Sequence, residues 1–518
     1  MDATRITTRT SVWLILAAVF VWRLFYAAVV PLDLVPDEAY YWHWSQHLDW
    51  GYYSKPPMIA WMIGLSTFLF GDSELGVRLP AVLLSTLGLW WVYLLGRSMY
   101  NERVGLFAML LCLATPGAVV MGLLMTIDAP FLFFWTVSLY ACWHLLQEEK
   151  TTFWTWGLAV LATGLGLLSK QTMVAIFPVV GCYLWGSWAV EYWNRQPAAS
   201  QLLRKLISPG VWFWGVFSLA FLTPVLVWNS QHEWITFQHT SSHFESQAVS
   251  IVKRLSFSGE FLLGQMGVGA PVTFIAFVMV SWRAIRNWRS LKPQERFLLS
   301  GSTIPLLAIF GLSLTQRVNP NWPAPFYIAG YVLTAAWFDN QFEQSFASSW
   351  FPTMRSRGFR RCLTWGLAVA AIVYAVPFVI GPLNLAGTSV DPTPRLRGWS
   401  DLAGKLQSFY EPGMFVMAAS NRNEASELAF YLPDHPPSYR WNPNGNIISQ
   451  YDIWGIPDGI AGRDGVIVSY ADQQLTDSLT NQFAFLEGPQ RLQIDLGHGR
   501  SRNYDIWIGR HFTTKEDQ

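Results

Sequence analysis

The stretch SVWLILAAVFVWRLFYAAVVP, from Ser11 to Pro31, decides the fold class of this chain of 518 residues. A membrane-spanning helix needs about 20 mostly apolar residues, and this stretch is long enough. It lacks the small-residue cleavage site of a secretory signal peptide, so we expect it to persist as a transmembrane helix. The composition agrees, because 52% of the residues are hydrophobic and 13% are charged, whereas a soluble domain carries about 25% charged residues.

Similar apolar stretches recur along the chain and predict about eleven spans within residues 1–382. With the N-terminus placed in the cytoplasm, most Lys and Arg residues of the connecting segments fall on the cytoplasmic side, as the positive-inside rule requires. An odd number of spans then places the C-terminus on the opposite side. The predicted spans are 11–31, 78–97, 104–122, 127–146, 153–169, 172–190, 211–228, 260–282, 297–315, 323–338 and 363–382.

Residues 383–518 have a different composition. Gly, Pro, Asn and Asp become frequent, and short alternating apolar segments appear, such as Met414–Ala418 and Gly465–Ser469. We therefore expect a small α/β domain on the outer, extracytoplasmic face. The aromatic and amide residues of Tyr439–Asn442 and Gln450–Trp454 either contact a ligand or form the core of this domain, and the sequence leaves both interpretations open.

The first outer loop begins with the motif PDEAYYW, residues 36–42. A proline followed by two acids suits the start of a helix. The aromatic side chains up to Trp44 then form a stripe along one face, which predicts a helix lying in the membrane interface. Asp37 and Glu38 either complement the helix dipole or take part in chemistry, and their spacing does not decide between the two.

Two further polar features fall on the same face. Lys55 lies in YYSKPP, residues 52–57, where two prolines stiffen the turn near the lipid headgroups. Its ammonium group either binds a phosphate or extends to the interface by snorkelling. Asp128 lies between the third and fourth predicted spans, where an acid either caps the next helix or serves a function.

Basic side chains at membrane depth need partners. Arg23 lies inside the first span, and Asp37, Glu38 or a lipid phosphate are its candidate partners. Lys170 separates two apolar stretches, and Arg317 precedes VNPNWPAP, a segment that cannot form a regular helix. Irregular backbone at this depth is tolerated where it lines a cavity.

The loop around residue 240 contains His239 and His243, which are spaced as zinc ligands on a helix often are. Because no HExxH motif accompanies them, we interpret them as polar residues of a loop and expect no metal ion. The formal net charge of +1 gives no indication of a nucleic-acid partner, and we expect no cofactor.

These motifs together resemble bacterial glycosyltransferase family 39, a group similar to protein O-mannosyltransferases and to aminoarabinose transferases of the ArnT type. The run from Asp37 to Leu95 carries the resemblance, with DEAYY, YYSKPPMIAW and FGDSELGVRLPA. Weaker similarity continues at Ser169-Lys170, Trp228-Asn229, Arg317, Asn321-Trp322-Pro323 and ASELAFYLP, residues 425–433. The span count departs from the family, because ArnT-like enzymes have thirteen spans.

The resemblance implies a GT-C fold in the bacterial inner membrane and an inverting transfer of a sugar from a polyprenyl-phosphate donor. The acceptor is a lipid, a glycan or a protein. By the same resemblance Asp37, Glu38 and Asp128 are the catalytic acids and Lys55 lies near the carrier phosphate. Arg23, Arg317 and Lys170 are further candidates for binding that phosphate.

A flippase that moves a lipid-linked sugar without breaking a bond is the alternative function. It would share the spans and the basic outer patch, but it gives no reason for paired acids beside a phosphate-binding lysine. The tail, residues 383–518, contains no acid motif like that at Asp37. We therefore expect it to shape acceptor access without taking part in the chemistry.

Overall fold

The computed structural model describes residues 3–147, 152–195, 208–242, 250–341 and 354–513. By its internal contacts the chain forms two units. The first is the helical unit, which comprises Met1–Phe25, Pro80–Glu233 and Thr240–Tyr374. The second is the loop–sheet unit, which comprises Tyr26–Leu79, Trp234–His239 and Ala375–Gln518. The loop after α1 is thus grouped with the C-terminal region, and the domain boundary at 382/383 stays a prediction.

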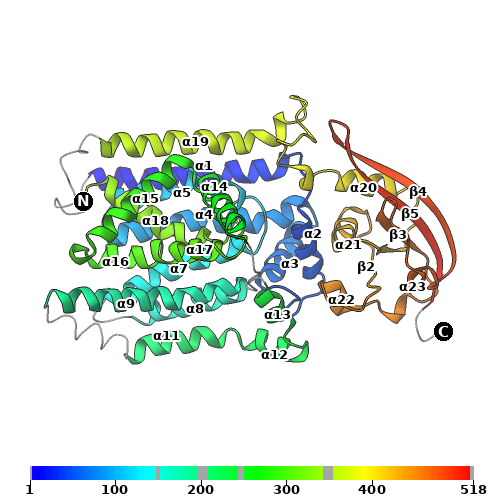
Figure 1. The fold of residues 1–518 in the computed structure, drawn as a ribbon, viewed down its shortest axis with the longest axis horizontal. Helices are drawn as coiled ribbons and strands as arrows, with labels where there is room; N and C mark the ends of the chain where they lie inside the picture. Colours follow the sequence, from blue (N-terminus) through cyan, green and yellow to red (C-terminus); the bar gives the residue numbers. More distant parts are fainter. Residues whose placement is uncertain (1–2, 148–151, 196–207, 243–249, 342–353, 514–518) are drawn as a thin grey trace. The chain divides into compact units, whose positions relative to one another are not determined.

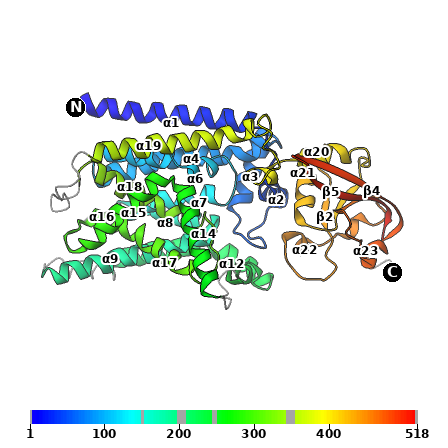
Figure 2. The same cartoon turned by 45° about the horizontal axis from the view of Figure 1, so that its top comes forward.

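The helical unit contains helices in every predicted span (Figure 1). Their bounds are α1 (Ala3–Val29), α4 (Glu74–Met99), α5 (Glu102–Leu113), α6 (Pro116–Val120), α7 (Asp128–Gln147), α8 (Phe153–Ser169), η1 (Gln171–Ala175), α9 (Ile176–Trp193), α11 (Pro209–Ala220), α12 (Thr223–Gln231), α14 (Ile251–Gly269), α15 (Pro271–Arg286), α16 (Pro293–Ser300), α17 (Thr303–Ser313), α18 (Ala324–Phe338) and α19 (Met354–Val379). α1 and α19 lie side by side (Figure 2), where the rings of Trp22 and Tyr374 meet edge to face.

The predicted number of about eleven spans stays a prediction, because the length and composition of the helices do not count the crossings. Among the described residues, six helices are long and apolar enough to cross a membrane, or eight if each of two bent pairs counts as one span. The remaining predicted spans coincide with the shorter helices α8 and α18 and with α5 and α6, which are separate helices. Apolar composition therefore located the helices but did not reveal which ones are short or interrupted.

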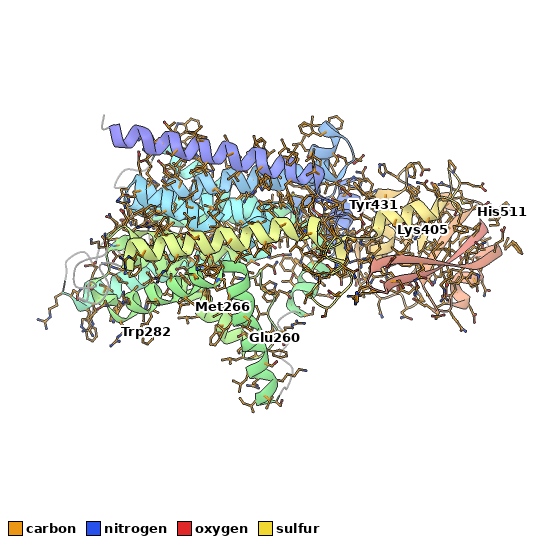
Figure 3. The ribbon with its side chains drawn as sticks, turned by 90° about the horizontal axis from the view of Figure 1, so that it is seen from above. Glu260, Met266, Trp282, Lys405, Tyr431 and His511 are labelled. Carbon is orange, nitrogen blue, oxygen red and sulfur yellow. The ribbon has the colours of Figure 1, made fainter. Side chains whose placement is uncertain are left out.

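The predicted span 260–282 is wrong as a single straight helix. It is divided between α14 and α15, whose axes differ by 109°. The break falls at Ala270, which has a positive φ of 60°, followed by Pro271, which cannot donate the next helical hydrogen bond. Figure 3 shows Glu260 and Met266 along α14 and Trp282 on α15, which runs in another direction.

α18 lies at the centre of the helical unit. Every residue from Ala324 to Phe338 is buried, and the helix packs against α5, α15 and α16. A helix that is apolar on all sides is one surrounded by other helices. Because other helices surround α18, its side chains are apolar on all sides, and this pattern predicted a span. The helix is nevertheless shorter than one that crosses a bilayer.

The loop–sheet unit begins with α2 (Pro36–Ser45) and α3 (Met58–Phe70). All residues of α2 except Asp37 are buried, so its aromatic stripe is covered by protein. The end of α3 exposes Leu65, Phe68 and Phe70, and such exposed apolar side chains suit a helix that dips into lipid. α13 (Ile235–Ser242) contributes its first residues to the same unit.

The C-terminal region contains a five-stranded sheet with the strand order β2-β1-β3-β5-β4, which confirms the predicted α/β composition. β1, β2 and β3 pair in parallel, whereas β5 is antiparallel to both β3 and β4. Alternate residues of β1 face two apolar clusters, so Val416 packs with Leu428 of α21 while Phe415 packs with Phe512. The elements are α20 (Trp399–Leu406), β1 (Phe415–Ala418), α21 (Arg422–Tyr431), β2 (Ser438–Arg440), α22 (Gln450–Trp454), β3 (Gly465–Tyr470), α23 (Asp477–Thr480), β4 (Phe483–Gly497) and β5 (Arg500–Phe512).

α21 carries two acids on its buried face. Glu424 and Glu427 are both fully buried, and burial raises the pKa of Glu424 to about 7 from its ordinary 4.5. Desolvation also raises the pKa of Glu427 well above its ordinary value. Because burial disfavours the charged form, both carboxyl groups bind a proton more readily in the folded chain than in the unfolded chain.

This shift predicts a pH-dependent loss of stability. Between about pH 4.5 and pH 7, Glu424 is ionised in the unfolded chain but still protonated in the folded chain. The free energy of unfolding therefore falls by on the order of 3 kcal/mol over this range and is constant at higher pH. Glu424→Gln should remove this loss, so the variant should unfold at a higher temperature than the wild type at pH 8 and at nearly the same temperature at pH 4. The unfolding temperature of the purified full chain tests this, and Glu411→Gln, at an exposed glutamate, is the control. Lower stability of Glu424→Gln at pH 8 would contradict the prediction.

Candidate active site

Asp37 lies in the first turn of α2, with Pro36 at the start of that helix. The Arg422 guanidinium donates from Nη2 to Asp37 Oδ1 at 2.7 Å. The side chains of Asp37 and Arg422 are 43% and 31% exposed, respectively. The carboxylate is thus held by a cation, yet it remains open to a ligand.

Arg422 is itself positioned by aromatic packing. Its guanidinium carbon lies 4.1 Å from the centre of the Tyr40 ring, a geometry that favours a cation. Although desolvation opposes it, the proximity of Tyr40 and Asp37 raises the pKa of Arg422 above its ordinary value. The Tyr40 hydroxyl accepts a hydrogen bond from the Gln450 backbone N–H at 2.5 Å, and burial raises the pKa of Tyr40 to about 12. The helix α2 and the C-terminal segments therefore position Asp37 together.

Glu38 differs from Asp37 in every contact. It is fully buried, and its Oε2 accepts from Arg78 Nη2 at 3.2 Å and from the Val35 backbone N–H at 3.0 Å. Arg78 Nη2 also donates to the Asp33 carbonyl at 2.7 Å. Glu38 therefore fixes the entry into α2 and the residues before it, and its catalytic role stays a prediction.

The turn at Lys55 is ordered by three contacts. The Tyr52 N–H donates to the Lys55 carbonyl at 3.2 Å, and the Tyr52 carbonyl accepts from Thr236 Oγ1 at 2.8 Å. The next backbone N–H, that of Tyr53, donates to Gln450 Oε1 at 2.7 Å. Lys55 thus lies on a fixed backbone in the same unit as Asp37.

Asp128 and Lys170 meet in the helical unit. Lys170 Nζ lies 2.7 Å from Asp128 Oδ1, and Asn321 Nδ2 donates to Oδ2, also at 2.7 Å. The Lys170 ammonium lies 5.4 Å from the centre of the Phe131 ring. The side chain of Asp128 is therefore occupied by these two partners, whereas Thr126 Oγ1 accepts from the backbone N–H of Asp128. Capping of α7 by Asp128 is thus not what the structure shows.

The other predicted basic residues have partners of their own. Arg317 is 78% exposed and pairs with Glu260 at 3.0 Å. Arg23 donates to Ser85 and to the Ala118 carbonyl. Of its three candidate partners, Glu38 pairs with Arg78 and Asp37 with Arg422 instead, and Arg23 makes no ion pair within the described part of the chain. The third candidate, a lipid phosphate, stays a prediction.

His239 packs against the Tyr53 ring with 4.8 Å between ring centres, while His243 lies outside the described residues. In the ranges that the structure describes, no group of three or more His, Cys, Asp or Glu side chains could hold a metal ion. His239 lies in the helix α13, so its interpretation as a loop residue is wrong.

Several site residues were missed by sequence reasoning. Arg422 comes three residues before the ASELAFYLP motif, but nothing local indicated its ion pair with Asp37. Gln450 and Tyr451 were expected to contact a ligand or to form the core of the tail. Both are buried and bond to the first loop instead, because the Tyr451 hydroxyl lies 2.7 Å from His43 Nδ1. The tail thus contributes directly to the surroundings of Asp37, which was not expected.

Comparison with known proteins gives the family. The sequence model described as dolichyl-phosphate-mannose-protein mannosyltransferase matches residues 54–228. The lipid A galacturonosyltransferase RgtD of Rhizobium johnstonii is 30% identical over 460 residues, which cover 87% of this chain and 89% of that protein. The chain belongs to bacterial glycosyltransferase family 39. This glycosyltransferase is a multi-pass membrane protein, as its apolar helices indicate.

A second relative and a solved structure are similar to this glycosyltransferase. An undecaprenyl phosphate-alpha-4-amino-4-deoxy-L-arabinose arabinosyl transferase of Pseudomonas aeruginosa is 31% identical over 176 residues, which cover 30% of this chain and 32% of that protein. The crystal structure of ArnT from Cupriavidus metallidurans superposes with a TM-score of 0.63 at 19% identity, and it covers 96% of this chain and 98% of that one. The superposition confirms the GT-C fold.

Proposed function

We propose that this glycosyltransferase moves a sugar from a polyprenyl-phosphate donor to a glycolipid acceptor on the outer face of the bacterial inner membrane. The observation that carries the proposal is the Asp37 carboxylate, open to a ligand and held by Arg422 at 2.7 Å. The names of the relatives support the substrates, since one acts on lipid A and another uses an undecaprenyl-phosphate sugar.

Asp37 acts on the acceptor in this proposal. A hydroxyl group is a poor nucleophile until its proton is removed, and a carboxylate within hydrogen-bond reach can take that proton in the transition state. The acceptor oxygen attacks the anomeric carbon as the bond to the carrier phosphate breaks, so the configuration inverts. Arg422 keeps the Asp37 carboxylate oriented during this proton transfer. The ion pair between Glu38 and Arg78 holds the start of α2 in place.

Lys55 acts on the donor. Breaking the sugar–phosphate bond leaves a phosphate with added negative charge, and a preorganised cation stabilises that charge as it develops. The ordered backbone of the Tyr52–Lys55 turn supplies such preorganisation. Lys170 and Arg317 have carboxylate partners of their own, and we assign the Asp128–Lys170 pair to the support of the helical unit.

The first prediction of this proposal concerns Asp37→Asn. The amide keeps the shape of the side chain but cannot accept a proton, so transfer should fall about 10²–10⁴-fold. Purified protein is incubated with a radiolabelled undecaprenyl-phosphate sugar and lipid A, and product is counted. The matched control is Asp401→Asn, an acid of similar exposure that pairs with Lys405, which should stay active. Normal turnover by folded Asp37→Asn protein would remove Asp37 from the mechanism.

The second prediction concerns orientation. The proposal requires Asp37 and the C-terminal region to lie outside the cytoplasm, where lipid-linked sugars and lipid A meet. Alkaline phosphatase folds only where its disulfides can form. Fusion after Gln518 should give an active reporter, and fusion after Gln341 an inactive one. The reverse pattern would place the candidate active site in the cytoplasm and exclude the proposed acceptor.

A further inference from the structure

A partly open cavity lies within the helical unit. Its volume is about 90 Å³, whereas one water molecule needs only about 10–15 Å³. The interrupted helices make this space, because Gly117 and Gly122 after the end of α5 line it together with Val268 before the α14 break. Apolar side chains such as Leu132 and Phe133 form much of the remaining wall.

Arg23 supplies the charge of this cavity. It is 1% exposed, and it donates from Nη1 to Ser85 Oγ at 2.7 Å and from Nη2 to the Ala118 carbonyl at 3.1 Å. Its Nε is buried without a hydrogen-bond acceptor among the described residues. The cavity lining includes the hydroxyl groups of Thr115 and Thr136 but no carboxylate.

A buried guanidinium without a counter-ion is costly. Charged groups at membrane depth pair with one another or mark the path of a ligand, and an uncompensated buried charge destabilises a protein by several kcal/mol. Lys170, the other cation discussed in this unit's interior, satisfies the rule through Asp128. The partners of Arg23 are the Ser85 hydroxyl and the Ala118 carbonyl, which are dipoles and carry no net charge. The positive charge of Arg23 is therefore not neutralised within the cavity lining.

From these contacts we infer that the Arg23 cavity binds the phosphate group of an isoprenoid lipid. The guanidinium donates to a phosphate oxygen through its unpaired Nε, as arginine does in phosphate sites elsewhere, and the apolar wall receives the first part of the hydrocarbon chain. The Thr115 and Thr136 hydroxyl groups already donate to the Cys112 and Leu132 carbonyls. The inference rests on the proposed function for the identity of the lipid. It adds an internal phosphate site to that function, supplied by α1 rather than by the Lys55 turn.

A purely structural role of Arg23 is the competing interpretation. The arginine would then serve to tie α1 to the Ala118 carbonyl at the short helix α6, and the unpaired Nε would be a tolerated cost. That interpretation predicts loss of folding but no specific effect on phosphate binding. The two are separated by a binding measurement that needs no turnover.

The experiment measures equilibrium binding of radiolabelled undecaprenyl phosphate to the purified full-length chain. It is done in a Lys55→Ala background, so that binding at Lys55 does not hide the cavity. Arg23→Gln should weaken binding about 10–100-fold, since a charge-assisted contact is lost, and Arg23→Lys should recover part of it. The control is Arg9→Gln on the same helix, whose partner is Glu102, and it should bind normally.

Two further arms separate the sources of phosphate. Undecaprenol, which lacks the phosphate, should bind weakly, and inorganic phosphate should compete only at much higher concentration than the lipid. Leu132→Trp fills the cavity while leaving Arg23 in place, so it should also weaken binding of the lipid even if Arg23→Gln fails to fold. Equal competition by inorganic phosphate would overturn the assignment of a lipid.

Unchanged binding in folded Arg23→Gln and Leu132→Trp would overturn the inference. So would complete loss of binding in Lys55→Ala alone, because no second site would remain. Neither of these binding results changes the outcome expected for Asp37→Asn in the transfer assay. The inference and the proposed function are therefore tested separately. Conversely, a chain that binds the lipid through Arg23 but transfers no sugar would refute the function and keep the cavity site.

Discussion

The carboxylate of Asp37 meets a guanidinium that the chain supplies 385 residues later. An exposed ion pair of this kind adds little to stability by itself, but it fixes the direction of a group that has to act on a ligand. Around it, the Tyr40 ring supports Arg422, and Gln450 bonds to both Tyr40 and Tyr53. The loop after α1 and the C-terminal region therefore form one unit, because side chains of each bond to the other.

Charge pairing governs the helical unit in a related way. Asp128 has a partner on each carboxylate oxygen, and both partners lie on segments where a helix ends or where the backbone is irregular. Interrupted helices expose polar backbone groups that must be satisfied inside the protein. Other interruptions, after the end of α5 and at the break between α14 and α15, border the Arg23 cavity. In both places the polar side chains of this unit lie where a helix is interrupted.

The sequence predicted those features that depend on local composition. Apolar stretches located every helix of the helical unit, alternating segments located β1 and β3, and the motif around Asp37 identified the family. It did not predict the turn at Ala270. It located α18 but not its burial at the centre of the helical unit, because a hydropathy pattern does not distinguish a helix facing lipid from one facing other helices. The pairing of Arg422 with Asp37 could not be read from either segment alone, since it depends on how distant parts of the chain fold together.

The claim that Arg422 orients Asp37 for catalysis is tested most directly by the donor turnover of Arg422 variants of the full chain. Arg422→Gln should lower kcat about 10–100-fold with little change in KM for the donor, and Arg422→Lys should retain part of the rate. Arg510→Gln removes an ion pair of similar exposure on β5 and should have no effect. Because Arg422 acts through Asp37, adding Arg422→Gln to Asp37→Asn should cause no further loss. Normal turnover by folded Arg422→Gln protein, or fully additive losses in the double variant, would contradict the account.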